Sequence, residues 1–168
     1  VVLGGTSDLP VLEAPQIKTS LQRILVVEDN DDLRNYLVDM LMAGYNIQSC
    51  SNGKDALVII KEFNPDLVIS DIMMPEMDGL ELCEHLKSNL DYSHIPIILL
   101  TAKTTLESKI EGLEQGADAY IEKPFSVEYL RVNVANLLSN RERLRRRFIE
   151  SPFITVSYTH RRCRRYAV

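Results

Sequence analysis

Five charged or reactive residues stand at or just beyond the ends of short apolar runs. They are Glu28, Asp29, Asp71, Thr101 and Lys123. If the fold brings the three carboxylates together, they repel one another unless a cation lies among them. Mg²⁺ suits such a cluster, because it takes few carboxylates and keeps positions for water and phosphate oxygens. We therefore expect a magnesium site that can receive a phosphoryl group.

The carboxylates have different expected roles in this site. Asp29 and Asp71 are the expected direct ligands of Mg²⁺, together with a backbone carbonyl near Met73. Glu28 is expected to act through a water molecule, because its side chain is longer and it stands one residue earlier.

The amine and the hydroxyl complete the expected chemistry. The ammonium of Lys123 can hold one phosphoryl oxygen, and the hydroxyl of Thr101 can donate to another. Such groups stabilise the charge on a phosphoryl group in transfer. A carboxylate that attacks phosphorus forms an acyl phosphate, and Asp71 is the expected acceptor because it ends the predicted central strand.

The segments between these residues alternate between strand-length apolar runs and amphipathic helical patterns. The predicted strands are 24–27, 45–50, 67–69, 95–100 and 119–122, and the predicted helices begin near Asn30 or Asp31, after Gly53, at Gly79, at Thr104 and at Ser126. Five such units predict an α/β fold, with a doubly wound five-stranded parallel sheet covered by helices on both faces. Ligands bind at the carboxyl ends of the strands in such sheets, which is where the five residues fall.

Each of these residues also has an ordinary explanation. Asp29 and Asn30 are good helix caps, Asp71 is a common turn residue, and Lys123 before a proline can be a solvated charge. Their joint position at the ends of four predicted strands favours a site over chance.

Composition excludes several other classes of protein. The formal net charge of the 168 residues is −5, which argues against nucleic-acid binding by the main domain. No apolar run approaches the ~18 residues of a membrane span. The cysteines, Cys50, Cys83 and Cys163, match no zinc or redox spacing, so we expect reduced thiols in a cytoplasmic protein.

Four segments make the sequence resemble the receiver domain of response regulators, the family that contains the chemotaxis receiver. They are ILVVEDN (24–30), ISDIMMPEMDG (69–79), IILLTA (97–102) and GADAYIEKPF (116–125). The resemblance covers about 22–140 and implies a flavodoxin-like (βα)5 fold with strand order 2-1-3-4-5.

The resemblance also implies roles for individual residues. Asp71 would accept a phosphoryl group from a phosphohistidine of a histidine kinase or its phosphotransfer domain, with Lys123 and Thr101 as catalytic groups. Thr101 and Tyr120 would act as the switch, although Tyr120 by itself reads as an ordinary sheet aromatic. Glu28 departs from the Asp of many members and is typical of receivers in hybrid sensor kinases.

The resemblance and the composition together divide the chain into four parts. We expect a linker over 1–21, the receiver domain over 22–140, and a helical linker over 141–155 towards a missing output domain, for example an AraC-type DNA-binding module. The arginines of RERLRRRF (141–148) could bind nucleic acid, but a solvated linker helix is favoured. We hypothesise that 156–168 is a non-native tail derived from a sequencing adapter.

Two other functions stay open at this stage. A pseudo-receiver that only binds partners would lack the acceptor, the acids or the lysine, and all are present. A phosphatase with an aspartyl nucleophile usually has a second Asp two residues later, where this chain has Met73. Whether to class the chain as an enzyme is left open, since a receiver catalyses its own phosphorylation and dephosphorylation and no kinase core is present.

Overall fold

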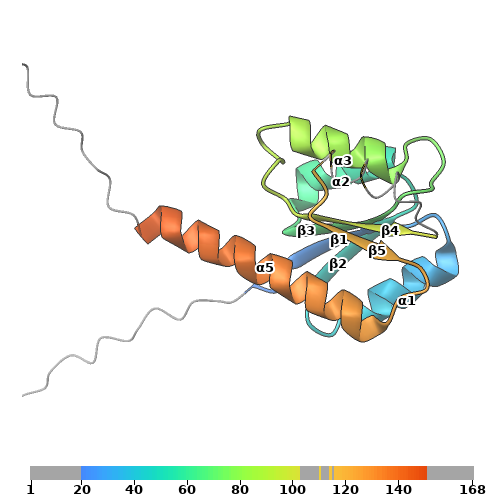
Figure 1. Ribbon diagram of the computed structural model, residues 1–168, viewed down its shortest axis with the longest axis horizontal. Coiled ribbons are helices and arrows are strands. Elements are labelled where there is room, and N and C mark those ends of the chain that lie inside the picture. Colours follow the sequence, from blue (N-terminus) through green and yellow to red (C-terminus); the bar gives the residue numbers. More distant parts are fainter. Residues whose placement is uncertain (1–19, 103–109, 111–113, 115, 151–168) are drawn as a thin grey trace, which may run out of the picture.

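The computed structural model describes residues 20–102, 110, 114 and 116–150. Of residues 149 and 150 it describes the backbone only. The strands form one parallel sheet in the order β2-β1-β3-β4-β5, which confirms the predicted order (Figure 1). The strands are β1 (Arg23–Val27), β2 (Asn46–Cys50), β3 (Leu67–Asp71), β4 (Ile97–Thr101) and β5 (Ala119–Glu122). The helices are α1 (Asp31–Leu41), α2 (Gly53–Phe63), α3 (Gly79–Ser88) and α5 (Val127–Glu150).

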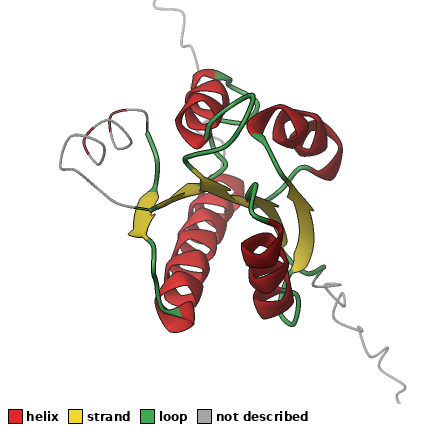
Figure 2. Cartoon of the chain, turned by 90° about the vertical axis from the view of Figure 1, so that its right-hand side faces the viewer, coloured by secondary structure: helices red, strands yellow, loops and turns green. Residues whose placement is uncertain are grey.

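The sheet has a hydrophobic core on each face, because helices cover both faces (Figure 2). Alternate residues of β1 point to opposite faces: Leu25 packs with residues of α2 and α3, whereas Ile24 packs with residues of α1 and α5. All five residues of β3 and all five of β4 are buried. This burial explains why the central strands read as continuous apolar runs in the sequence.

Side-chain caps fix where the helices begin. The Asn30 side chain accepts a hydrogen bond from Leu33 N at 2.9 Å, so Asn30 rather than Asp31 caps α1. Asn52 caps α2 in the same way, and Asp78 caps α3. Each capped helix follows a strand, so the amino ends of these helices lie at the carboxyl edge of the sheet.

The predicted fourth helix, with its capping box of Thr104 and Glu107, lies mostly outside the described residues. The expected linker over 1–21 and the expected tail over 156–168 also lie almost wholly outside them. None of the helices that the structure describes is long and apolar enough to cross a membrane.

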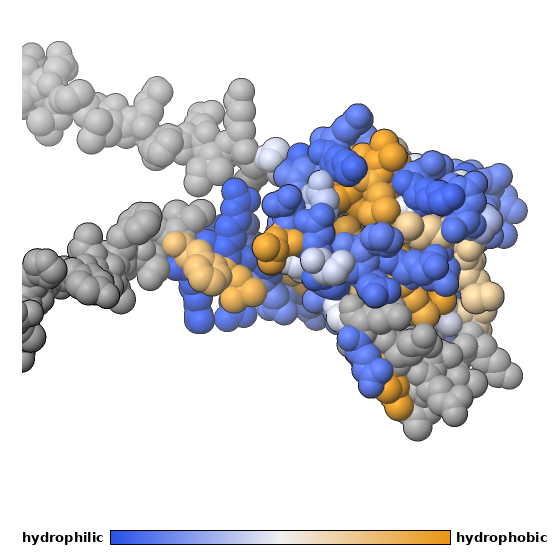
Figure 3. Space-filling view, turned by 90° about the horizontal axis from the view of Figure 1, so that it is seen from above, coloured by the Kyte–Doolittle hydropathy of each residue, from blue (hydrophilic) through white to orange (hydrophobic). Residues whose placement is uncertain are grey.

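Helix α5 runs on past the body of the domain, as the sequence predicted. Its first half packs on the sheet through Leu130, Val134 and Leu138, which are buried. Arg141 then pairs with Asp66 at 3.2 Å at the amino end of the sheet. Beyond this contact the helix projects from the domain, with apolar side chains in view along its surface (Figure 3).

Candidate functional site

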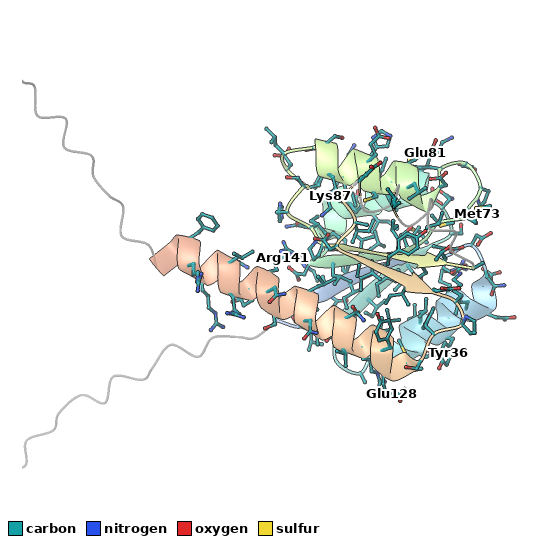
Figure 4. The ribbon with its side chains drawn as sticks, viewed as in Figure 1. Tyr36, Met73, Glu81, Lys87, Glu128 and Arg141 are labelled. Atoms are coloured by element: carbon teal, nitrogen blue, oxygen red, sulfur yellow. The ribbon has the colours of Figure 1, made fainter. Side chains whose placement is uncertain are left out.

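The predicted site residues come together at the carboxyl edge of the sheet, on the right in Figure 1. Glu28 follows β1, Asp71 ends β3, Thr101 ends β4, and Lys123 follows β5. Figure 4 shows Met73 at this edge, while Arg141 lies towards the amino end of the sheet. The parallel register therefore joins residues that are far apart in the sequence.

The three acids form a compact cluster. Carboxylate oxygens of Glu28, Asp29 and Asp71 lie within 4.8 Å of one another. Glu28 is 1% exposed and Asp71 is 6% exposed, whereas Asp29 lies on the surface. This set of hard oxygen donors, buried on one side and open on the other, fits Mg²⁺ with water or phosphate oxygens in its remaining positions. The Met73 side chain is exposed and its thioether is a poor ligand for Mg²⁺, so only its backbone carbonyl suits the predicted role.

Lys123 joins the two buried carboxylates. Its Nζ atom donates to Glu28 Oε2 at 2.8 Å and lies 3.1 Å from Asp71 Oδ1. Its backbone N–H donates to the carbonyl of Thr101 at 2.6 Å, which holds the end of β5 beside the end of β4. The ammonium that the sequence placed at this edge thus lies within hydrogen-bond reach of the predicted acceptor.

Burial dominates the electrostatics of the cluster. It raises the pKa of Asp71, and the hydrogen bond and charge of Lys123 oppose the rise only in part. Burial also raises the pKa of Glu28, again against the hydrogen bond from Lys123. The pKa of Lys123 is raised, because its bonds to the two carboxylates outweigh its own burial. The two buried acids are therefore only partly compensated by one lysine, and a further cation at the cluster would be favourable.

Gly79, the predicted start of a helix, brings the loop after β3 close to Asp71, the predicted acceptor. A Cβ atom on Gly79 would lie 2.1 Å from the backbone oxygen of Asp71 and 2.9 Å from Ile72 Cα. The N–H of Gly79 donates to the carbonyl of Ile72 at 2.9 Å. The first residue of α3 therefore needs to lack a side chain for the loop to close against Asp71.

Tyr120 and Thr101 lie on neighbouring strands. Thr101 is buried, and Tyr120 packs partly buried against the core between the sheet, α2 and α3. The Tyr120 hydroxyl is itself buried, and no residue in the described part of the chain forms a hydrogen bond with it. An unpaired buried hydroxyl is unfavourable, so little holds the ring in this position apart from apolar packing.

The chain matches a known protein family and several named proteins. The family model for the response regulator receiver domain matches residues 24–135. Histidine kinase P4 of Formosa agariphila is 44% identical over 154 residues, which are 89% of this chain and 11% of that protein. Response regulator MprA of Mycolicibacterium vanbaalenii is 41% identical over 117 residues, which are 69% of this chain and 50% of that protein. The chain thus spans half or less of the length of these curated relatives.

A solved structure agrees with this match. The signal receiver domain of a signal transduction histidine kinase from Syntrophus aciditrophicus aligns with a TM-score of 0.68 at 36% identity, covering 82% of this chain and 99% of that one. Receiver domains generally bind Mg²⁺ at an acidic cluster, and Glu28, Asp29 and Asp71 form a candidate cluster of this kind. Since the matched residues include the whole sheet apart from the first residue of β1, together with all three acids, this chain belongs to the response regulator receiver domain family of two-component signal transduction.

Proposed function

We propose that Asp71 accepts a phosphoryl group from a phosphohistidine of a histidine kinase or its phosphotransfer domain, in a reaction that requires Mg²⁺. The observation that carries this proposal is the position of Asp71. Its carboxylate is almost wholly buried, 3.1 Å from the ammonium of Lys123 and beside two further acids. Asp29 and Asp71 would hold Mg²⁺ directly with the Met73 carbonyl, and Glu28 would do so through water.

The groups of the chain divide the chemistry between them. A carboxylate oxygen of Asp71 forms a new bond to phosphorus as the P–N bond of the phosphohistidine breaks. The imidazole nitrogen leaves with the electron pair of that bond and takes a proton from solvent. Bound Mg²⁺ supplies positive charge that offsets the charge of the acids and the phosphoryl oxygens. Lys123 and the Thr101 hydroxyl then hold phosphoryl oxygens, Lys123 by exchanging its present bonds to the carboxylates.

The same groups provide a conformational switch in this proposal. Thr101 moves towards the phosphoryl group, and the Tyr120 ring, which is partly buried with a buried hydroxyl in this structure, exchanges between this position and a second one. The unpaired hydroxyl of Tyr120 supports this, because a ring held mainly by apolar packing can exchange between two positions of similar free energy. Contacts that only the phosphorylated state can make then shift the balance.

We further propose that the receiver controls an output domain within a longer cytoplasmic protein, such as an AraC-type transcription regulator. The matched regulators and kinases are longer than this chain, and α5 offers a path out of the domain. Leu144 is 57% exposed and Phe148 is 83% exposed on the projecting end, as a surface that packs against a following segment would be. In this proposal 1–21 and 141–155 act as linkers. We also keep the hypothesis that 156–168 derives from a sequencing adapter.

One experiment tests the acceptor. The whole chain is incubated with Mg²⁺ and acetyl phosphate, and its intact mass is measured. We expect a single phosphoryl adduct that is lost with Asp71→Asn or excess EDTA and kept with Asp39→Asn, an exposed acid of α1. No adduct on the unaltered chain would support a module that only binds partners. An adduct that survives Asp71→Asn would place the acceptor elsewhere, and continuous turnover of phosphate esters would indicate a hydrolase.

A further inference from the structure

We propose that Arg34 is a positioning residue for the metal site, because it fixes the backbone from which Glu28 and Asp29 project. This inference rests on the proposed function, since it concerns the affinity of the same acidic cluster for Mg²⁺. Arg34 touches none of the reacting groups and would act only through the segment that joins β1 to α1.

Arg34 ties the end of β1 to the first turn of α1. Its Nη1 atom donates to the backbone carbonyl of Glu28 at 2.8 Å, and its Nη2 atom pairs with the carboxylate of Asp31. The Arg34 side chain is only 18% exposed and its bond to the Glu28 carbonyl is partly buried, so water competes weakly for that bond, whereas the pair with Asp31 lies at the surface. The N–H of Arg34 donates to the carbonyl of Asn30 at 2.9 Å, so the backbone that carries the guanidinium is held in the first turns of α1.

The other polar groups of Glu28 are already engaged. Its N–H donates to the carbonyl of Cys50 at 3.1 Å, and its carboxylate accepts from Asn30 N at 3.2 Å and from Lys123. The backbone carbonyl is the remaining group, and Arg34 binds it. Among the residues that the structure describes, Arg34 therefore holds the carbonyl of the peptide that joins Glu28 to Asp29.

Asp29 depends on this peptide more than the other two acids do. Asp71 is held by a buried strand and by Lys123, and Glu28 by Lys123 and Asn30. Within the described residues no hydrogen bond holds the exposed carboxylate of Asp29, so its position follows from its backbone. Partners of this kind behind metal ligands typically change metal affinity by roughly 10- to 100-fold when they are removed.

The test compares two arginine–carbonyl bonds, one at each end of α1. Arg34→Ala removes the bond at the amino end of α1, and Arg131→Ala removes the bond from α5 to the carbonyl of Met40, which is 2.9 Å long and lies at the other end of α1. Mg²⁺ affinity is measured by calorimetry on the whole chain, and the melting temperature is measured in EDTA. We expect the Kd for Mg²⁺ to rise roughly 10-fold or more with Arg34→Ala and to stay within about two-fold with Arg131→Ala.

The melting temperatures separate positioning from general stability. An effect on stability alone would lower the melting temperature of Arg34→Ala in EDTA and leave its Kd unchanged, and this result would overturn the inference. An equal loss of affinity in both variants would overturn it too. If Arg34→Ala does not fold, Arg34→Met replaces it, because methionine keeps an unbranched side chain without the hydrogen-bond donors, and a Kd equal to that of the unaltered chain would count against the inference. Failure of the unaltered chain to bind Mg²⁺ would instead contradict the proposed function, and the inference with it.

Discussion

Replacing Gly79 by alanine should destabilise the domain, although alanine is the better helix former. Gly79 is the first residue of α3, and alanine there would gain up to about 1 kcal/mol from helix propensity. The new Cβ atom would, however, lie 2.1 Å from the backbone oxygen of Asp71, and a backbone atom cannot move aside as a side chain can. Overpacking of this kind costs about 1–3 kcal/mol. We expect the steric term to win, with a net loss of about 1–2 kcal/mol in the free energy of unfolding.

Gly53 provides the matched control, because it is the first residue of α2. A Cβ atom on Gly53 would lie 2.6 Å from Met77 Cγ, which belongs to a flexible side chain. Methionine adapts readily to a new neighbour, so Gly53→Ala should change stability by less than about 1 kcal/mol in either direction.

The stability of both variants is measured by urea unfolding, and their phosphorylation by the rate of adduct formation with acetyl phosphate. We expect Gly79→Ala to lose stability and also to slow phosphorylation, because relief of the overlap moves the backbone of Asp71. Gly53→Ala should be phosphorylated at the normal rate. A Gly79→Ala variant that is as stable as the unaltered chain and reacts as fast would refute the role given to this glycine.

Three further predictions concern the charged and thiol groups. Lys123→Met leaves two buried carboxylates without their partner, so in EDTA it should lower the free energy of unfolding by roughly 2–4 kcal/mol, part of which added Mg²⁺ should restore. Equal stability with and without Mg²⁺ would argue against a cation among the acids. Lys87→Met removes bonds of 2.8 Å to Asp118 and 3.0 Å to the carbonyl of Ile95 at the amino end of β4, and should cost roughly 1–3 kcal/mol in urea unfolding while phosphorylation stays within about two-fold. Burial raises the pKa of Cys50 from 9.0 to about 11, so in a Cys163→Ser chain at pH 8 this thiol should react with iodoacetamide about 100-fold more slowly than in urea and gain rate as the pH rises towards 11. Equal rates in the folded and unfolded chain would contradict that shift.

The fold could be predicted because burial leaves a direct mark on the sequence. The central strands β3 and β4 are covered on both faces and carry continuous apolar runs, so their position and parallel arrangement were readable. Asp71 and Thr101 could be placed at the sheet edge for the same reason, because they stand where these runs end, and Glu28 and Asp29 follow the buried β1; Lys123 follows the shorter and less buried β5. The choice between Asn30 and Asp31 as the cap of α1 needed the hydrogen bond to Leu33, because both residue types cap helices well.

The remaining features depend on contacts between segments and leave no local signal. Arg34 reads as a charged residue on an exposed helix face, and only the path of β1 brings the carbonyl of Glu28 to its guanidinium. Gly79 reads as a helix start, and its close approach to Asp71 follows from the closure of the loop. The burial of the Tyr120 hydroxyl depends on the rotamer of its side chain, which strand periodicity does not fix.

Reduction of the phosphorylated chain with borohydride tests the acceptor most directly, because the reagent converts an aspartyl phosphate into homoserine. The chain is treated with acetyl phosphate and Mg²⁺, reduced, digested and sequenced by mass spectrometry. Conversion should be found at position 71 alone and should disappear when EDTA replaces Mg²⁺. Conversion at Asp29 or at another carboxylate, or none at all on a chain that carries the adduct, would contradict the assignment of Asp71 as the acceptor.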